Sequence, residues 1–365
     1  MAATEGHTHE AGHLAQPPVL VDFFSGCGGT SLGFRIAGMR VLAGVDNDPS
    51  SGTTFEKNFP EATFFRKDIR SMRPSELSGT ITSAASSPLV FSACAPCQPF
   101  SKQRRQTKVG DDRIPLLLEF YKFVKRYRPA CIFIENVPGM QRGVDAESPF
   151  QEFRKKIQKH DYHVSVAVVS SASYGVPQRR YRLVALASRL GPIKFPPPTH
   201  GPGTSHPEYS TVREWISDLP ALAAGEEHPS VPNHRASGLS DLNLRRIRVT
   251  PEGGGRNDWP KELELECHTN GYKGHSDVYG RMSWDAPATG LTTRCISLSN
   301  GRFGHPTQNR AISVREAACL QTFPRDFTFT GHWEAMGRQI GNAVPVLLAT
   351  KFGVQIVKHI DEYRC

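Results

Sequence analysis

The chain has 365 residues, of which 38% are hydrophobic and 22% charged, so it can form one large domain or two ordinary ones. No run approaches the roughly 20 apolar residues that cross a bilayer, which argues against an integral membrane protein. Eight scattered cysteines argue against a small disulfide scaffold and predict free thiols in a reducing compartment. The net charge of +9 favours a polyanionic partner such as nucleic acid.

Residues 1–18 lack the basic start and the apolar core of a signal peptide. Their three histidines could bind a metal, but a solvated polar tail explains this composition better. We therefore expect a disordered N-terminal tail and no metal site.

From residue 19 onward, short apolar runs alternate with amphipathic segments. The apolar runs predict strands over residues 18–24, 40–46, 63–69, 88–93, 130–137, 163–170 and 181–188. The amphipathic segments predict helices over residues 30–39, 114–128 and 151–160. In the first helix, Leu32, Ile36 and Met39 should share one buried face. Strand followed by helix, repeated, predicts an α/β fold with a doubly wound, mostly parallel, Rossmann-like sheet.

The composition changes at about residue 191, where a Pro- and Gly-rich segment begins and loops come to dominate. Helical pattern returns over residues 313–323 and 341–360. Residues 191–310 carry 13 Lys and Arg against 13 Asp and Glu, so the basic excess lies elsewhere. We expect a second, smaller, loop-rich domain, which divides the chain into 1–18 (tail), 19–190 (first domain), 191–330 (second domain) and 331–365 (a segment returning to the first domain).

A glycine-rich turn, DFFSGCGGTSLGF, follows the first strand, and it could bring backbone N–H groups close to a ligand. Asp46 ends the second strand and Asp68 follows the third, at the sheet edge where open α/β folds bind ligands. This arrangement suggests a nucleoside cofactor. The turn departs from the dinucleotide pattern, since Ser31 replaces its third glycine, and a purely structural tight turn stays open as an alternative.

Cys97 follows the fourth strand and therefore lies at the same edge. Prolines on both sides restrict its backbone, and the basic residues that follow would favour the reactive thiolate. Glu135 ends the fifth strand, so a nucleophile and an acid should meet beside the ligand site. A zinc or redox pair of Cys94 with Cys97 is the rival, but Cys267 and its neighbouring histidine are the only further ligand pair.

Six segments, FSGCGG, APCQPFS, ENV, PQRRYR, REAACLQTFP and QIGNAVP, occur in the order found in the cytosine-5 DNA methyltransferase family. The resemblance runs from about residue 19 to 350 and implies a Rossmann-like methyltransferase fold that binds S-adenosylmethionine. It also implies that Cys97 is the nucleophile, that Glu135 engages cytosine N3, and that Arg180 and Arg182 lie near the base. The residues that resemble the cofactor pocket are Phe24, Gly26, Cys27, Gly29, Asp46 (ribose), Asn47, Asp68 and Ile69 (adenine), Pro96, Leu116 and Asn342.

The chain departs from the family pattern at a few positions. Asn47 stands where an aromatic residue usually packs on the adenine, Cys94 replaces a glycine, and Cys319 replaces an arginine. Ile114-Pro115 replaces the more common glycine-containing pair. None of these changes removes a catalytic group, so we expect altered binding rather than lost chemistry.

The resemblance places the family's target-recognition region at residues 191–310, and implies duplex DNA as substrate with the target base flipped out of the stack. Candidate DNA contacts are Gln98, Ser101, Lys102, Arg104 and Arg105 beside the nucleophile, and Arg256, Lys273, Arg281, Arg294 and Arg302 in the recognition region. Two alternatives stay open: an RNA cytosine-5 methyltransferase, and a non-catalytic DNA-binding relative.

We further expect a monomer without a membrane partner. In a bacterial host the chain should be cytoplasmic and associated with the nucleoid. A cognate restriction endonuclease that acts separately is the additional partner that such an enzyme suggests.

Overall fold

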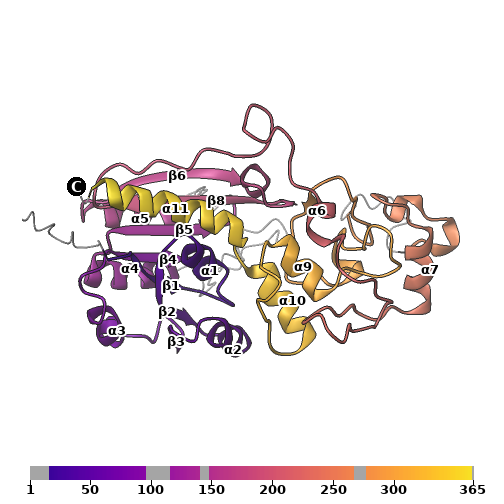
Figure 1. The fold of residues 1–365 in the computed structure, drawn as a ribbon, viewed down its shortest axis with the longest axis horizontal. Helices are drawn as coiled ribbons and strands as arrows, with labels where there is room; N and C mark the ends of the chain where they lie inside the picture. The colour runs from indigo at the N-terminus through magenta and orange to yellow at the C-terminus, as the bar shows by residue number, and fades with distance from the viewer. Residues whose placement is uncertain (1–15, 96–115, 140–147, 267–276, 364–365) are drawn as a thin grey trace, which may run out of the picture.

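The computed structural model describes residues 16–95, 116–139, 148–266 and 277–363 (Figure 1). A lobe built on a large sheet is joined to a smaller lobe of short helices and loops. Residues 1–15, 96–115 (with the predicted nucleophile Cys97), 140–147, 267–276 and 364–365 lie outside the described residues.

A seven-stranded sheet forms the larger lobe, in the order β3-β2-β1-β4-β5-β8-β6. The five strands from β3 to β5 pair in parallel, and β8 is antiparallel to both of its neighbours. The doubly wound, mostly parallel sheet is therefore confirmed. The chain passes from β6 to β8 without a crossover helix, and so short a connection permits only antiparallel pairing. The strand bounds are β1 Val19–Phe23, β2 Arg40–Asp46, β3 Thr63–Arg66, β4 Leu89–Ala93, β5 Cys131–Asn136, β6 His163–Ser170 and β8 Tyr181–Ser188.

Helices cover both faces of the sheet. On one face lie α1 (Gly29–Ile36), α2 (Pro49–Asn58) and α11 (Val346–Glu362), and on the other lie α3 (Ser78–Thr82), α4 (Leu116–Tyr127) and α5 (Pro149–Gln158). Each face has its own cluster of buried aromatic rings. Phe34, Phe133 and Phe352 pack in the first core, and Phe23, Phe91 and Phe120 in the second.

The expected buried face of the first helix was partly wrong. Leu32 and Met39 are buried, but the Ile36 side chain is 58% exposed. The helix ends at Ile36 and the chain reverses at Gly38, which has a φ of 95°, so Met39 is no longer on the helix. Helical spacing therefore does not account for the burial of Met39, and Ile36, at the last position of the helix, is the residue that misses the buried face.

The smaller lobe contains little regular structure, as its composition predicted. A two-stranded pair of β7 (Gln178–Arg179) with β9 (Ala288–Thr289) links it to the region just before β8. Its other elements are α6 (Val212–Ile216), α7 (Asp241–Val249), η4 (Arg256–Asp258), η5 (Lys261–Leu263), η6 (Leu298–Asn300), α9 (Val314–Leu320) and α10 (Trp333–Asn342).

The segment Trp333–Glu362 has the length and composition of a membrane span, although we expected no such stretch. It consists of two helices, α10 and α11, and 56% of its most apolar window is buried inside the protein. α11 packs closely on α1, where Gly353 lies against Phe34 and Ala37. These two helices are therefore core elements of the fold.

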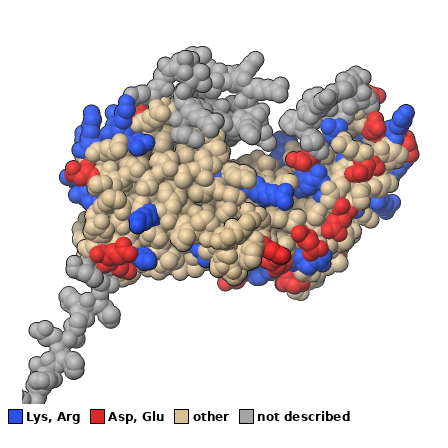
Figure 2. Space-filling model, turned by 90° about the horizontal axis from the view of Figure 1, so that it is seen from above, with Lys and Arg blue, Asp and Glu red and all other residues tan. Residues whose placement is uncertain are grey.

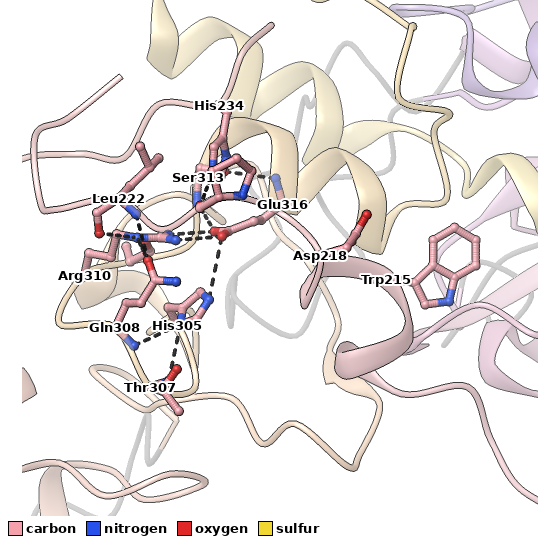
Figure 3. Close-up of polar contacts among 12 residues, drawn as sticks. Trp215, Asp218, Leu222, His234, His305, Thr307, Gln308, Arg310, Ser313 and Glu316 are labelled. Atoms are coloured by element: carbon pink, nitrogen blue, oxygen red, sulfur yellow. Dashed lines mark hydrogen bonds and ion pairs between the residues drawn. The ribbon is translucent and has the colours of Figure 1, made fainter. Parts of the chain in front are cut away.

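A buried ion pair stabilises the smaller lobe (Figure 3). Arg310 donates two hydrogen bonds of 2.7 Å to the carboxylate of Glu316, and both side chains are at most 1% exposed. Burial raises the pKa of Glu316, but the hydrogen bonds and the charge of Arg310, together with His305 and the Ser313 N–H, outweigh this effect and keep the pKa below its usual value. Glu316 also accepts the backbone N–H of Ser313, which begins α9. The charge thus fixes the start of this helix.

Replacing Arg310 with Met should destabilise the protein by about 3–5 kcal/mol, because Glu316 would remain buried without its cation. Equilibrium unfolding in urea measures this change. Arg66→Met is the matched control, since its pair with Glu56 is exposed, and it should hardly move the unfolding midpoint. A similar midpoint for both variants would contradict the assignment.

Candidate active site

The turn between β1 and α1 has an unusual backbone. Phe24, Gly26 and Gly28 have φ angles of 57°, 52° and 97°, in the left-handed region that favours glycine. A side chain at Gly28 would also meet the ring of Phe59 at 2.4 Å. Around Gly26, by contrast, a Cβ would find no atom of the described residues within 4 Å, so these residues leave space beside this part of the turn.

Asp46, at the end of β2, holds this turn in place. Its Oδ2 accepts the backbone N–H of Gly26 at 2.9 Å, and its Oδ1 accepts that of Asp48 at 2.9 Å. Burial raises the pKa of Asp46 despite these hydrogen bonds. The predicted ribose acid therefore also positions the glycine turn. Asn47 follows it and is exposed.

The C-terminal part of the chain closes over the start of α1. The Cys27 thiol points to the carbonyl oxygen of Gln339, with 3.7 Å between the two atoms, and burial raises its pKa to about 12. A Cβ on Gly29 would lie 2.6 Å from the carbonyl oxygen of Val344. Asn342 ends α10 beside this contact and is exposed. Residues more than 300 positions apart thus meet at the turn.

The remaining predicted pocket residues have different environments. Phe24 is half-buried, whereas Ile69 and Leu116 are buried. The side chain of Asp68 forms an ion pair with Arg70, whose hydrogen bonds lower the pKa of Asp68. Asp68 is therefore ionised and paired with Arg70.

Glu135 and Arg182 form the charged pair at the carboxyl end of β5. The Arg182 Nε lies 2.9 Å from the Glu135 Oε1, and the Glu135 side chain is 9% exposed. This contact is an ion pair without hydrogen-bond geometry, so within the described residues Oε1 accepts no hydrogen bond. Next to it, the Asn136 Nδ2 donates to the carbonyl oxygen of Ala95 at 2.9 Å. The end of β5 thereby fixes the chain immediately before the nucleophile segment.

Arg180 connects the two lobes. Its Nη1 donates to the carbonyl oxygens of Leu291 (2.9 Å) and Gly341 (3.2 Å), and its Nη2 donates to that of Ala343 (3.4 Å). Burial lowers its pKa to about 9. Its buried Nε has no acceptor among the residues that the structure describes. Arg180 thus joins backbone segments of both lobes, and its unbonded Nε–H lies beside the Glu135–Arg182 pair.

Two glutamines complete this junction, and sequence analysis gave them no role. Both are fully buried, and the Gln178 Nε2 donates to the Gln321 Oε1 at 2.9 Å. The Gln178 Oε1 accepts the backbone N–H of Leu291 at 2.9 Å, and the Gln321 Nε2 donates to Ile340 at 2.7 Å. Both glutamines lie inside motifs of the sequence, PQRRYR and REAACLQTFP, and this position was the signal that could have marked them as important.

Cys94, which replaces a glycine of the family pattern, follows β4 and lies near Thr30 of α1 and Glu135 of β5. Its sulfur lies 3.6 Å from the Thr30 Oγ1, and burial raises the pKa of its thiol well above the usual value. A neutral thiol therefore lines this edge. The described residues contain no group of three side chains that could hold a metal ion.

Several predicted residues lie outside the described residues: Pro96, Cys97, Gln98, Ser101, Lys102, Arg104, Arg105 and Lys273. The described part of the site lies at the sheet edge where β4 ends, just before residue 96. It consists of the glycine turn, Asp46 and the Glu135–Arg182 pair.

The base-reading role expected for Arg281 is wrong. Its side chain is buried and donates to five acceptors, including the carbonyl oxygens of Thr250 and Ile247 at 2.7 Å. No N–H remains for a base. Arg302 donates to the carbonyl oxygens of Gly253 and Gly254, so it is partly engaged. Arg294 is exposed and Arg256 half-buried.

Comparison with known proteins identifies the family. Residues 19–358 match the family described as C-5 cytosine-specific DNA methylase. The chain belongs to this family. It is therefore a DNA cytosine-5 methyltransferase, and the resemblance drawn from its six motifs is confirmed.

Relatives of this methylase cover nearly its whole length. The Type II methylase M.HgiDII of Herpetosiphon aurantiacus is 41% identical over 94% of this chain and 96% of its own. The Type II methyltransferase M1.HphI of Haemophilus parahaemolyticus is 33% identical over 93% and 86%. Among solved structures, the S. pombe Dnmt2 methyltransferase covers 95% of this chain and 99% of its own with a TM-score of 0.58 at 16% identity, which shows a shared fold.

The methylase should tolerate no side chain at Gly29. Gly29→Ala is expected to destabilise it by about 1–3 kcal/mol, because the new Cβ would collide with the backbone of Val344. Gly79→Ala is the matched control, since a Cβ there meets no atom of the described residues within 4 Å. Thermal unfolding compares the two, and equal melting temperatures would contradict the close contact.

Proposed function

We propose that this enzyme transfers a methyl group from S-adenosylmethionine to C5 of cytosine in duplex DNA, through a covalent bond between Cys97 and C6. The observation that carries the proposal is the sheet edge, where the glycine turn, Asp46 and the Glu135–Arg182 pair gather beside the segment that begins after Ala95. Open α/β sheets bind ligands at this edge.

The turn fits a nucleoside cofactor. The described residues leave space beside Gly26, and Asp46 has carboxylate lone pairs left for ribose hydroxyls. The buried Ser25 Oγ has no hydrogen-bond partner among the described residues. S-adenosylmethionine, when bound, supplies an electrophilic methyl group. We propose that its pocket is formed by Phe24, Gly26, Cys27, Gly29, Asp46, Asn47, Asp68, Ile69, Pro96, Leu116 and Asn342.

Cytosine C5 is a weak nucleophile, and addition of a thiolate at C6 makes it reactive. Glu135 would protonate or hydrogen-bond the base at N3, where charge develops, and the lack of any hydrogen bond to its buried Oε1 among the described residues supports this role. The Arg182 Nε lies 2.9 Å from the same oxygen, and the Nε–H of Arg180, which has no acceptor among the described residues, is available beside the pair. After methyl transfer, a base removes the C5 proton and the thiol leaves.

We further propose that the chain has two domains. The catalytic domain spans residues 19–190, the target-recognition domain spans residues 191–330, and residues 331–365 return to the catalytic domain. The remaining DNA candidates in the recognition domain are Arg256, Lys273, Arg294 and Arg302, with Gln98, Ser101, Lys102, Arg104 and Arg105 for the phosphates near the base. Relatives named as Type II enzymes support a place in a bacterial restriction-modification system. In this proposal the enzyme is a cytoplasmic monomer, and the restriction endonuclease acts separately.

Cys97→Ala should abolish methylation, because no other thiol is proposed to attack C6. Bisulfite sequencing of a methylation-free bacterial host that expresses each variant measures this and reveals the target sequence. Cys365→Ala, at the last residue, is the matched control and should retain full activity. Protected cytosines with Cys97→Ala would contradict the mechanism. A separate assay compares the transfer of labelled methyl groups to tRNA and to duplex DNA, and transfer to tRNA alone would show that the substrate is RNA.

Asn47→Trp should tighten S-adenosylmethionine binding by roughly two- to tenfold, because an aromatic ring could pack on the adenine. Isothermal titration calorimetry gives the Kd of each variant. Asn257→Trp, at another exposed asparagine, should leave the Kd unchanged. Weaker binding by Asn47→Trp would show that position 47 does not face the adenine.

A further inference from the structure

A buried carboxyl group lies beneath the cofactor turn and has no part in the mechanism above. Asp22 sits on β1, two residues before Phe24, and is 0% exposed. Its Oδ2 accepts the hydroxyl of Ser31 at 2.6 Å, and its Oδ1 accepts that of Ser92 at 2.5 Å. Ser31 belongs to α1 and Ser92 to β4. Asp22 therefore links the helix after the turn to the strand that leads to the nucleophile.

The groups that face Asp22 do not neutralise its charge. Asp46 of β2 acts on it as a second acid, and the neighbouring thiols of Cys27 and Cys94 are kept neutral by burial. Glu135 of β5 is a further acid near Cys94. Across the part of the chain that the structure describes, no cation pairs with Asp22 or Asp46.

An ionised carboxylate in such a place is costly unless a positive charge comes near. Burial raises the pKa of Asp22 to about 6, so near neutral pH the group is mostly charged. The two acids thus create a negative potential around the turn. A cationic ligand at the turn would lower the free energy of this charge, whereas a neutral ligand would not.

The methyl donor and its product differ by one such charge. When the methyl group moves to carbon, the bond between sulfur and methyl breaks and its electron pair stays on sulfur. The sulfonium of S-adenosylmethionine thereby becomes the neutral thioether of S-adenosylhomocysteine. The adenosine, amino and carboxyl groups are the same in both molecules, so their contributions cancel when the two affinities are compared.

We propose that Asp22, together with Asp46, makes the cofactor site selective for the cationic methyl donor over its neutral product. The inference rests on the proposed function, since it takes S-adenosylmethionine as the ligand of the turn. Asp22 is a specificity-determining residue that acts through the field in the site, and its two serine hydroxyls hold the carboxylate in position.

Calorimetric titration of both ligands, without DNA, tests the proposal at pH 7. In Asp22→Asn, the ratio of the product's Kd to the donor's Kd should fall by roughly three- to tenfold, because the substitution removes one negative charge that favours the cationic ligand. Asp161→Asn removes an acid whose side chain is 81% exposed, and it should leave the ratio unchanged. An unchanged ratio in Asp22→Asn overturns the inference.

The wild-type protein provides a second test, which decides the question if Asp22→Asn does not fold. Asp22 is protonated below its pKa of about 6, so the same ratio should rise as the pH is raised from 5 to 7. This range lies below the titration of the ligands' amino groups. A flat ratio overturns the inference. Failure of both ligands to bind at all would instead overturn the proposed cofactor, and the inference with it.

Discussion

The junction of Gln178, Arg180 and Gln321 is the contact on which the arrangement of this methylase depends. The two glutamine side chains bond to each other, and Arg180 and Gln321 donate to backbone carbonyls at Leu291 and at the end of α10. Buried backbone carbonyls need donors, and these long side chains supply them. The smaller lobe, the C-terminal helices and the start of β8 are thereby fixed relative to one another.

The same junction also positions the ion pair at the end of β5. Arg180 bonds to backbone carbonyls of the junction, and Arg182, two residues later on β8, contacts Glu135 on the neighbouring strand β5. The C-terminal chain that Gln321 and Arg180 hold is also the chain that packs on Gly29. The glycine turn, the Glu135–Arg182 ion pair and the smaller lobe are therefore parts of one packed unit. The acids below the turn, Asp22 and Asp46, give this unit a negative interior.

Much of the fold followed from local pattern. Apolar runs and strand ends predicted β1 to β5, and with them the edge that carries Asp46 and Glu135. The helices α2 and α10 were not predicted, because their apolar residues are few or interrupted by glycine. Arg281 was misjudged because a buried and an exposed arginine look alike in sequence. The pairing of Gln178 with Gln321 spans 143 positions and leaves no local signal.

By itself, the sequence determined the fold class, the family and the residue types at the catalytic edge, because these depend on periodicity and on short motifs in order. Only the tertiary structure decided which polar side chains are clamps, which form ion pairs and which face open space. Burial and partner geometry settle those roles, and both depend on residues far apart in the chain. Asp22 is the clearest case: its motif is local, but its isolation from any cation within the described residues arises only when β1, β2 and β4 come together.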